Sequence, residues 1–250
     1  MFFSVNKMTQ KHLFRIVFIL LTGAVIYANT FNVPFFLDDH PEIINNTDIH
    51  NLHEFVFSVD NLLTNRYVAH LISAINYHFG GLDVTGYHVV NLIIHLCSSL
   101  LVYLLLHLTL VTPYYYSFGK AGLSQFQAPI AGGQGHDKAD YLLRWVPFLA
   151  AMLFVSHPVQ TQAVTYVVQR MTSLSTFFFL LSIVFYVKGR LVVEGPCSRA
   201  REAADRTSQN GSNRVLTSGL LIAGSMVSAI LAMKSKEIAF TLPLVIALYE

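Results

Sequence analysis

Long apolar runs separated by polar connections are the dominant pattern of this chain, and charged residues are almost absent from the runs. A helix of about 20 apolar residues crosses the hydrocarbon core of a bilayer, which is about 30 Å thick. The pattern therefore predicts an all-α fold, a polytopic integral membrane protein built as a bundle of transmembrane helices. The predicted spans lie near residues 13–31, 87–111, 145–156, 172–187, 215–233 and 238–250.

The first and last apolar runs need separate interpretation. The first follows Lys7, Lys11 and Arg15, as the apolar part of a signal peptide would. No small-x-small cleavage site clearly follows it and further spans come later, so we interpret it as an uncleaved transmembrane helix. The last run starts at Ile238 and reaches Glu250 without a polar stop. Because a helix this short is a poor span, we expect the natural protein to continue beyond it.

Composition narrows the functional classes. Hydrophobic residues make up 54% of the chain and charged residues 12%, against about a quarter charged in soluble domains. The net charge is only +2, and there is no basic stripe with interleaved aromatic residues, so nucleic acid is not an expected partner. Cys97 and Cys197 lie in an apolar and a polar segment and indicate neither a disulfide framework nor a metal site.

The charges of the connections predict an orientation. The loop 32–86 holds seven of the 14 acidic residues and a single basic one, Arg66, whereas 12 of the 16 basic residues lie before or at the start of the first span or in the segments 113–144 and 188–214. The positive-inside rule then places the N-terminus and these two segments in the cytoplasm. The loop 32–86, the connection 157–170 and the turn 234–237 would face outward.

The predicted outward loop has helical character. Tyr67, Leu71, Ile75 and Phe79 repeat at four-residue intervals, which is typical of an amphipathic helix lying on or near a membrane. The Gly80-Gly81 pair would end this helix, and residues 48–57 would form a second short one. The first outward loop is therefore expected to be folded, not a flexible linker.

Four basic residues lie outward against the rule: Arg66, Arg170, Lys234 and Lys236. An anionic headgroup, such as a lipid-linked phosphate, would explain cations gathered at one membrane boundary. The alternative is that each snorkels to ordinary lipid phosphates. Glu237 follows Lys236 directly and is predicted to reach Lys234, three residues earlier.

Asp38 and Asp39 follow the first span directly. Adjacent carboxylates repel each other, which would raise the pKa of at least one of them unless a cation is near. Such a pair suits a general base, and it leaves a divalent metal open as a cofactor, although no full ligand set is visible. The alternative is an acidic N-cap for a helix starting near Pro41.

Two further polar groups interrupt the apolar runs. His157 and Gln160 flank Pro158 at a spacing that places both on one face of a helix; they form either a polar site or a structural cap. His88, Asn91 and His95 share one face of the second span. Because they have no acidic or cysteine partner nearby, hydrogen bonds between helices are favoured over a metal site.

The order of these motifs resembles a known family. The acidic pair in FFLDDHPEIINN precedes TNRYVAHLISAINYHFGGLDVTGYHVVNLIIH, then HPVQTQAVTYVVQRMTSLSTFFFLLS and KSKEIAFTLPLVIALYE. From about Phe31 to Glu250 the chain resembles the N-terminal membrane part of the tetratricopeptide-repeat-containing protein O-mannosyltransferase-like family. Those proteins resemble glycosyltransferases of the C superfamily. Gln162 stands where many relatives have Glu, and no tetratricopeptide repeat is present in the 250 residues.

The resemblance implies a function and a set of site residues. A glycosyltransferase would move a mannose-like sugar from a polyprenyl- or dolichyl-phosphate carrier to a hydroxyl acceptor on a protein or glycan, with inversion. Asp38 and Asp39 fall on the catalytic acidic motif of the first loop, and further polar motif positions fall on His157, Arg170, Lys236 and Glu237.

Residue chemistry agrees with this implied function. A carboxylate could take the proton of the attacking hydroxyl, and Arg66, Arg170 or Lys236 could stabilise the leaving phosphate. The lipid bilayer would hold the carrier's tail. The expected location is the bacterial inner membrane with a periplasmic site, or the ER membrane with a lumenal site in a eukaryote.

Two other classes stay open at this point. A transporter or flippase of lipid-linked precursors also needs outward cations, but it would place polar residues at mid-membrane in inverted repeats, and none are visible. A non-catalytic membrane scaffold is the second alternative.

Overall fold

A computed structural model of the chain describes residues 2–112, 135–194 and 211–249. These residues form helices and their connections, with no β-strand among them. Much of the two segments predicted to be cytoplasmic, together with Cys197, lies outside the described residues. Four helices in the described part are long and apolar enough to cross a membrane: His12–Asn32, Val84–Leu110, Val167–Val193 and Asn213–Met233. The all-α, polytopic membrane fold predicted from the sequence is confirmed.

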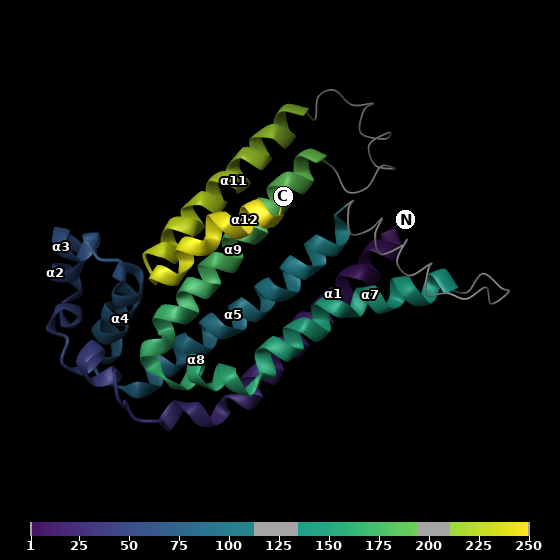
Figure 1. The fold of residues 1–250 in the computed structure, drawn as a ribbon. Helices are drawn as coiled ribbons and strands as arrows, with labels where there is room; N and C mark the ends of the chain where they lie inside the picture. The colour runs from purple at the N-terminus through teal and green to yellow at the C-terminus, as the bar shows by residue number, and fades with distance from the viewer. Residues whose placement is uncertain (1, 113–134, 195–210, 250) are drawn as a thin grey trace.

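The long helices form a bundle. In chain order they are α1 (Phe2–Ile26), α5 (Val84–Val111), α7 (Gly135–Ser156), α9 (Arg170–Glu194) and α11 (Gly211–Met233), followed by the shorter α12 (Leu242–Tyr249). Figure 1 shows α5 running between α7 and α9, with α1 alongside α7 and α11 alongside α9. Two further apolar helices are shorter than the four long spans: Trp145–Ser156 within α7, and Glu237–Tyr249, which combines the 3₁₀ turn Glu237–Thr241 with α12. That each helix crosses a bilayer stays a prediction.

Small residues allow the helices to approach closely. A Cβ on Gly23 of α1 would lie 2.4 Å from Leu96 Cδ2 of α5 and 2.8 Å from Val155 Cγ2 of α7. Between α9 and α11, the Ser182 hydroxyl donates to the Ser225 carbonyl at 2.9 Å. Glycine and serine at helix contacts are typical of membrane bundles, where close packing and hydrogen bonds replace the hydrophobic effect.

The loop after α1 folds into a compact helical unit. The chain passes through a short 3₁₀ turn, Ala28–Asn32, and then through His40–Ile44 (π), Thr47–His50 (3₁₀), α2 (Leu52–Phe57), α3 (Val59–Leu63) and α4 (Tyr67–Gly80). Its core consists of Ile43, Ile49, Phe55 and Ala74, packed with Tyr87 of α5 and Val167 of the turn before α9. The predicted folded first loop is confirmed.

Of the two helices predicted in this loop, one forms as expected and the other is divided. The predicted amphipathic helix is α4, and it ends before Gly81, whose φ of +57° suits glycine. The predicted second helix, residues 48–57, is split into a 3₁₀ turn and α2. Asn51 causes the break, because its side chain accepts a hydrogen bond from the backbone N–H of Glu54 and so begins a new helix.

Candidate functional site

Three connections meet at one end of the bundle, which we call the loop rim. They are residues 33–39 after α1, residues 157–169 between α7 and α9, and residues 234–236 after α11; all three lie near the lower ends of the helices in Figure 1. The Thr30 and Thr165 hydroxyls are 3.0 Å apart, and the backbone N–H of Val68 in α4 donates to the Lys234 carbonyl at 3.1 Å. Segments more than 100 residues apart are thus joined at the rim.

The loop rim separates the two aspartates. Asp39 is fully buried, and its carboxylate accepts hydrogen bonds from the backbone N–H groups of Val168 (2.7 Å) and Phe36 (3.2 Å). Asp38 is exposed, and its backbone N–H donates to the Tyr166 hydroxyl at 3.0 Å. Leu37 just before them has a φ of +50°, a strained conformation of the kind found at functional sites.

Burial sets the ionisation of Asp39. It raises the pKa of the Asp39 carboxyl above its ordinary value, while the hydrogen bonds from Phe36 and Val168 act in the opposite direction. A raised pKa at one aspartate was predicted, but its cause is desolvation and not repulsion from the neighbouring carboxylate. The N-cap alternative is not what the geometry shows, because the Asp39 side chain makes no cap bond to the helix at His40–Ile44.

Arg170 begins α9 and lies inside the protein, with 2% of its surface exposed. Its guanidinium donates to Asn91 Oδ1 (2.9 Å), the Tyr87 carbonyl (2.9 Å) and Ser73 Oγ (3.4 Å), and it lies 5.1 Å from the centre of the Tyr87 ring. These contacts join α9, α5 and α4. The arginine predicted to bind phosphate is therefore placed behind the rim surface.

The polar face of α5 holds the connections in place. His88 donates to the Val33 carbonyl (2.9 Å), Asn91 to the Val164 carbonyl (3.3 Å) and His95 to the Val155 carbonyl (3.3 Å). The predicted hydrogen bonds between helices are made by Asn91 and His95, whereas His88 bonds to Val33 in the connection after the first helix. Among the described residues, no three His, Cys, Asp or Glu side chains are grouped to hold a metal ion.

The other three cations differ in their partners. Arg66 contacts Glu42 (3.4 Å) and Glu237 (3.7 Å). Glu237 therefore pairs with Arg66 and not, as predicted, with Lys234, because the Lys234 ammonium donates to the carbonyls at the end of α3, those of Leu62, Leu63 and Thr64.

Lys236 has a different environment from these pairs. Its ammonium donates to Thr172 Oγ1 at 2.7 Å. No salt bridge forms between Lys236 and any carboxylate in the described part of the chain. Of the predicted phosphate-binding cations, Lys236 therefore differs from Arg66 in having no carboxylate partner within the described ranges and from Arg170 in not being buried.

His157 and Gln160, predicted as one polar site, have different surroundings. His157 is exposed, and its ring nitrogen accepts a hydrogen bond from the backbone N–H of Val159 (3.3 Å), which caps the 3₁₀ turn Pro158–Gln160. This is the structural cap that the sequence left open as an alternative. Gln160 instead lines a pocket.

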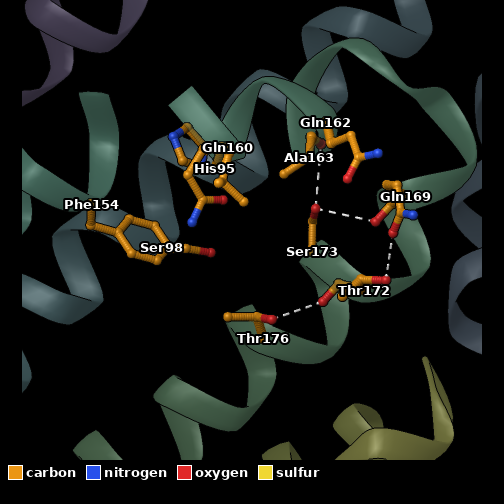
Figure 2. Close-up of a pocket in the computed structure, with 11 residues that line it drawn as sticks. His95, Ser98, Phe154, Gln160, Gln162, Ala163, Gln169, Thr172, Ser173 and Thr176 are labelled. Carbon is orange, nitrogen blue, oxygen red and sulfur yellow. Dashed lines mark hydrogen bonds between the residues drawn. The ribbon is translucent and has the colours of Figure 1, made fainter. Parts of the chain in front are cut away.

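The pocket lies among α5, α7, α9 and the short helix α8 (Thr161–Thr165), with a volume of about 250 Å³ (Figure 2). Amides, hydroxyls and two rings line it, among them His95, Ser98, Phe154, Gln160, Gln162 and Thr172. Sequence reasoning missed most of these residues. The sequence feature that could have indicated this pocket is the high density of Gln, Ser and Thr between residues 160 and 176, a stretch with only one charged residue.

Comparisons with known proteins give one consistent group of relatives. The chain is 30% identical over 178 residues to a protein of Homo sapiens named protein O-mannosyl-transferase TMTC2, and 33% identical over 177 residues to human protein O-mannosyl-transferase TMTC4. It is 34% identical over 124 residues to protein O-mannosyl-transferase Tmtc3 of Drosophila melanogaster.

Coverage in these matches is unequal. They include 66%, 66% and 50% of this chain but 18%, 22% and 12% of the relatives. The chain thus spans less than a quarter of the length of the curated relatives it matches. No protein-family model matches the chain, and no solved structure does.

Proposed function

Because the chain belongs to the same family as these protein O-mannosyl-transferases, we propose that it is a membrane glycosyltransferase with its active site at the loop rim. It transfers mannose from a polyprenyl- or dolichyl-phosphate carrier to a hydroxyl group of a protein acceptor. The observation that carries this proposal is the contrast within the acidic pair: Asp38 is exposed at the rim, while Asp39 is buried and tied to Val168.

We assign proton transfer to Asp38. Both carboxylate oxygens of Asp39 accept bonds from backbone N–H groups, so this side chain positions the connection 33–39. Asp38 has its carboxylate at the surface, where an acceptor hydroxyl can reach it. Its place is fixed by the bond from its backbone N–H to Tyr166 and by Phe36, whose ring stacks on Tyr166 with centroids 4.6 Å apart.

The reaction is a single displacement. The acceptor oxygen forms a bond to the anomeric carbon, its proton passes to Asp38, and the bond from that carbon to the phosphate oxygen breaks. The lipid phosphate leaves with the electron pair, and the anomeric configuration is inverted. Since no acid has to protonate this leaving group, its charge is stabilised by cations.

Of the cations, Lys236 is the best placed to contact the phosphate: unlike Arg66 it has no carboxylate partner among the described residues, and unlike Lys234 its ammonium is not held by three backbone carbonyls. Arg66 can contribute once a phosphate competes with Glu42 and Glu237. Arg170 is buried and each of its three guanidinium nitrogens donates a hydrogen bond to the protein, so we assign it to holding α9 and not to the phosphate. The matched relatives are animal proteins, which favours the lumenal face of the ER membrane over the bacterial periplasm.

Transfer assays in proteoliposomes test the proposal. The full chain is supplied with radiolabelled dolichyl-phosphate mannose and a Ser/Thr-rich acceptor peptide. Asp38→Asn is expected to lower the rate about 10²–10⁴-fold, since this is the typical contribution of a general base. Asp60→Asn, at an exposed position of the same loop, is the matched control and should transfer at the wild-type rate.

The possible outcomes separate the functional classes. Full activity of Asp38→Asn would show that Asp38 is not the base. Movement of the labelled lipid between leaflets without transfer would support a flippase, and the absence of both activities in the wild type would support a scaffold.

A further inference from the structure

The pocket in Figure 2 is lined by neutral groups. No Asp, Glu, Lys or Arg side chain is part of its lining. Three glutamines contribute to it, Gln160, Gln162 and Gln169, and the only other glutamine that the structure describes is Gln10 in α1. A pocket of amides and hydroxyls suits a ligand with many neutral hydroxyl groups, and it disfavours an ionised one, which would be desolvated without a counter-charge.

Two of these amides are available to a ligand. Gln169 accepts a hydrogen bond from the Thr172 hydroxyl at 2.8 Å. In the described part of the chain no hydrogen bond satisfies the side-chain amides of Gln160 and Gln162, and Figure 2 shows both at the edge of the same hollow. Each offers two donors and one acceptor, the combination that recognises neighbouring hydroxyls of a sugar ring.

Size and shape limit the ligand further. The volume of about 250 Å³ is below the range of roughly 300–1,000 Å³ of pockets that take drug-sized molecules. One sugar ring is therefore expected, not an oligosaccharide. The His95 and Phe154 rings stack with centroids 5.4 Å apart, and Phe154 gives the otherwise polar pocket an apolar wall for the C–H face of a sugar.

A cation lies at the edge of this neutral pocket. Thr172, one of its lining residues, accepts the hydrogen bond from the Lys236 ammonium at 2.7 Å. A ligand with a neutral ring and a phosphate on one carbon would match this arrangement, because the ring would meet the amides and the phosphate would meet the lysine.

We propose that this pocket binds the neutral hexose of the lipid-linked donor, with its ring hydroxyls on Gln160 and Gln162 and its phosphate at Lys236. The inference rests on the proposed function and adds to it the subsite that distinguishes the sugar-bearing carrier from the empty one.

Equilibrium binding to the full chain in lipid nanodiscs tests the inference without relying on turnover. Radiolabelled dolichyl-phosphate mannose and dolichyl phosphate are compared. The wild type is expected to bind the mannose-bearing lipid about tenfold more tightly, as one or two net hydrogen bonds would give. The double variant Gln160→Leu/Gln162→Leu should bind both lipids equally, with the affinity for dolichyl phosphate unchanged. Lys236→Gln should weaken both lipids by the same factor.

Controls keep the result interpretable. Gln10→Leu, at an exposed position of α1 away from the pocket, should retain the tenfold preference. The single variant Gln162→Leu changes an exposed side chain, so it provides a folded protein even if the double variant does not fold, and it should lose part of the preference.

Failure of the pocket and failure of the proposed function give different results. A wild type that transfers mannose while the glutamine variants keep the full preference would overturn the pocket assignment alone. Equal binding of both lipids by the wild type would also overturn it. A wild type that binds neither lipid and transfers no mannose would overturn the proposed function as well.

Discussion

Asp39 shows how a single buried carboxylate can organise the loop rim. It is completely enclosed, yet both of its oxygens are hydrogen-bonded to backbone groups, those of Phe36 and Val168. Buried polar groups are tolerated when they are paired in this way. Its burial fixes the connection 33–39 against the segment before α9, and the adjacent Asp38 is thereby held at the surface.

A pH-dependent stability follows from the raised pKa of Asp39. A carboxyl whose folded-state pKa lies above its unfolded value of 3.8 stabilises the fold below that value, and this contribution is lost as the pH rises through the folded-state pKa. Asp39→Asn removes the dependence. We therefore expect the melting temperature of the variant minus that of the wild type, measured in detergent, to increase as the pH rises from 4 to 7. A constant difference across this range would contradict the assignment, and Asp60→Asn provides the reference profile.

The buried guanidinium of Arg170 provides a second prediction at the residue scale. Arg170→Lys keeps the charge but loses the planar group that reaches Asn91, the Tyr87 carbonyl and Ser73 together. We expect the free energy of unfolding to fall by about 2–4 kcal/mol, measured by unfolding in SDS. Arg214→Lys, at an exposed position, should change it by less than about 0.5 kcal/mol. Equal stability of Arg170→Lys and wild type would show that the contacts are dispensable.

The sequence identified Asp38, Asp39 and Arg170 as candidate site residues, but it did not predict which groups surround them. Asp38 and Asp39 are chemically identical neighbours, and what separates them is a backbone N–H at Val168, 129 residues later. Arg170 was predicted to face the membrane boundary because it stands at the start of an apolar run, but Asn91 and Ser73 bind it inside the protein. Burial of one residue depends on distant segments, which a local pattern does not specify.

At the scale of elements, the position of α1 depends on a residue without a side chain. Gly23 lies so close to Leu96 of α5 and Val155 of α7 that a Cβ atom at this position would clash with both side chains. The existence of α1 was predictable from its apolar run, whereas this contact was not, because the sequence shows a glycine but not which helix packs on it.

Substitution of Gly23 tests this contact. Gly23→Ala would force the Leu96 and Val155 side chains to move, at a cost of about 1–3 kcal/mol in the free energy of unfolding. Gly219→Ala in α11 is the matched control, since nothing lies within 4 Å of its added Cβ, and it should be neutral or stabilise by up to about 1 kcal/mol. Thermal unfolding in detergent compares the two. If Gly23→Ala proves as stable as Gly219→Ala, α1 does not pack as described.

At the scale of the whole molecule, the convergence of distant connections at the loop rim is the feature that the sequence predicted best. The concentration of basic residues in alternate connections indicated that the loop after the first span, the connection around His157 and the turn at Lys234 share one side of the membrane. In the structure they share one end of the bundle. The pocket was not predictable, because it takes residues from α5, α7, α8, α9 and the two short turns between α7 and α9, whose mutual packing no charge pattern describes.

Sidedness can be measured directly. In a chain whose native Cys97 and Cys197 have been replaced by serine, Asp60→Cys and His157→Cys should react with a membrane-impermeant maleimide from the same side of sealed vesicles. Asn213→Cys, at the opposite end of α11, should react only after the vesicles are opened. Labelling of positions 60 and 157 from different sides would contradict the single active-site surface.

The bonds made by Lys234 have a consequence for how the protein is made. Its ammonium binds the carbonyls of Leu62, Leu63 and Thr64, and its own carbonyl binds the backbone N–H of Val68. The early loop is thus fastened by a residue 166–172 positions later. A ribosome adding about 5–20 residues per second needs on the order of 10–30 s to cover that interval. During this time the early loop has been synthesised but lacks these bonds, so it cannot complete its contacts until translation passes Lys234.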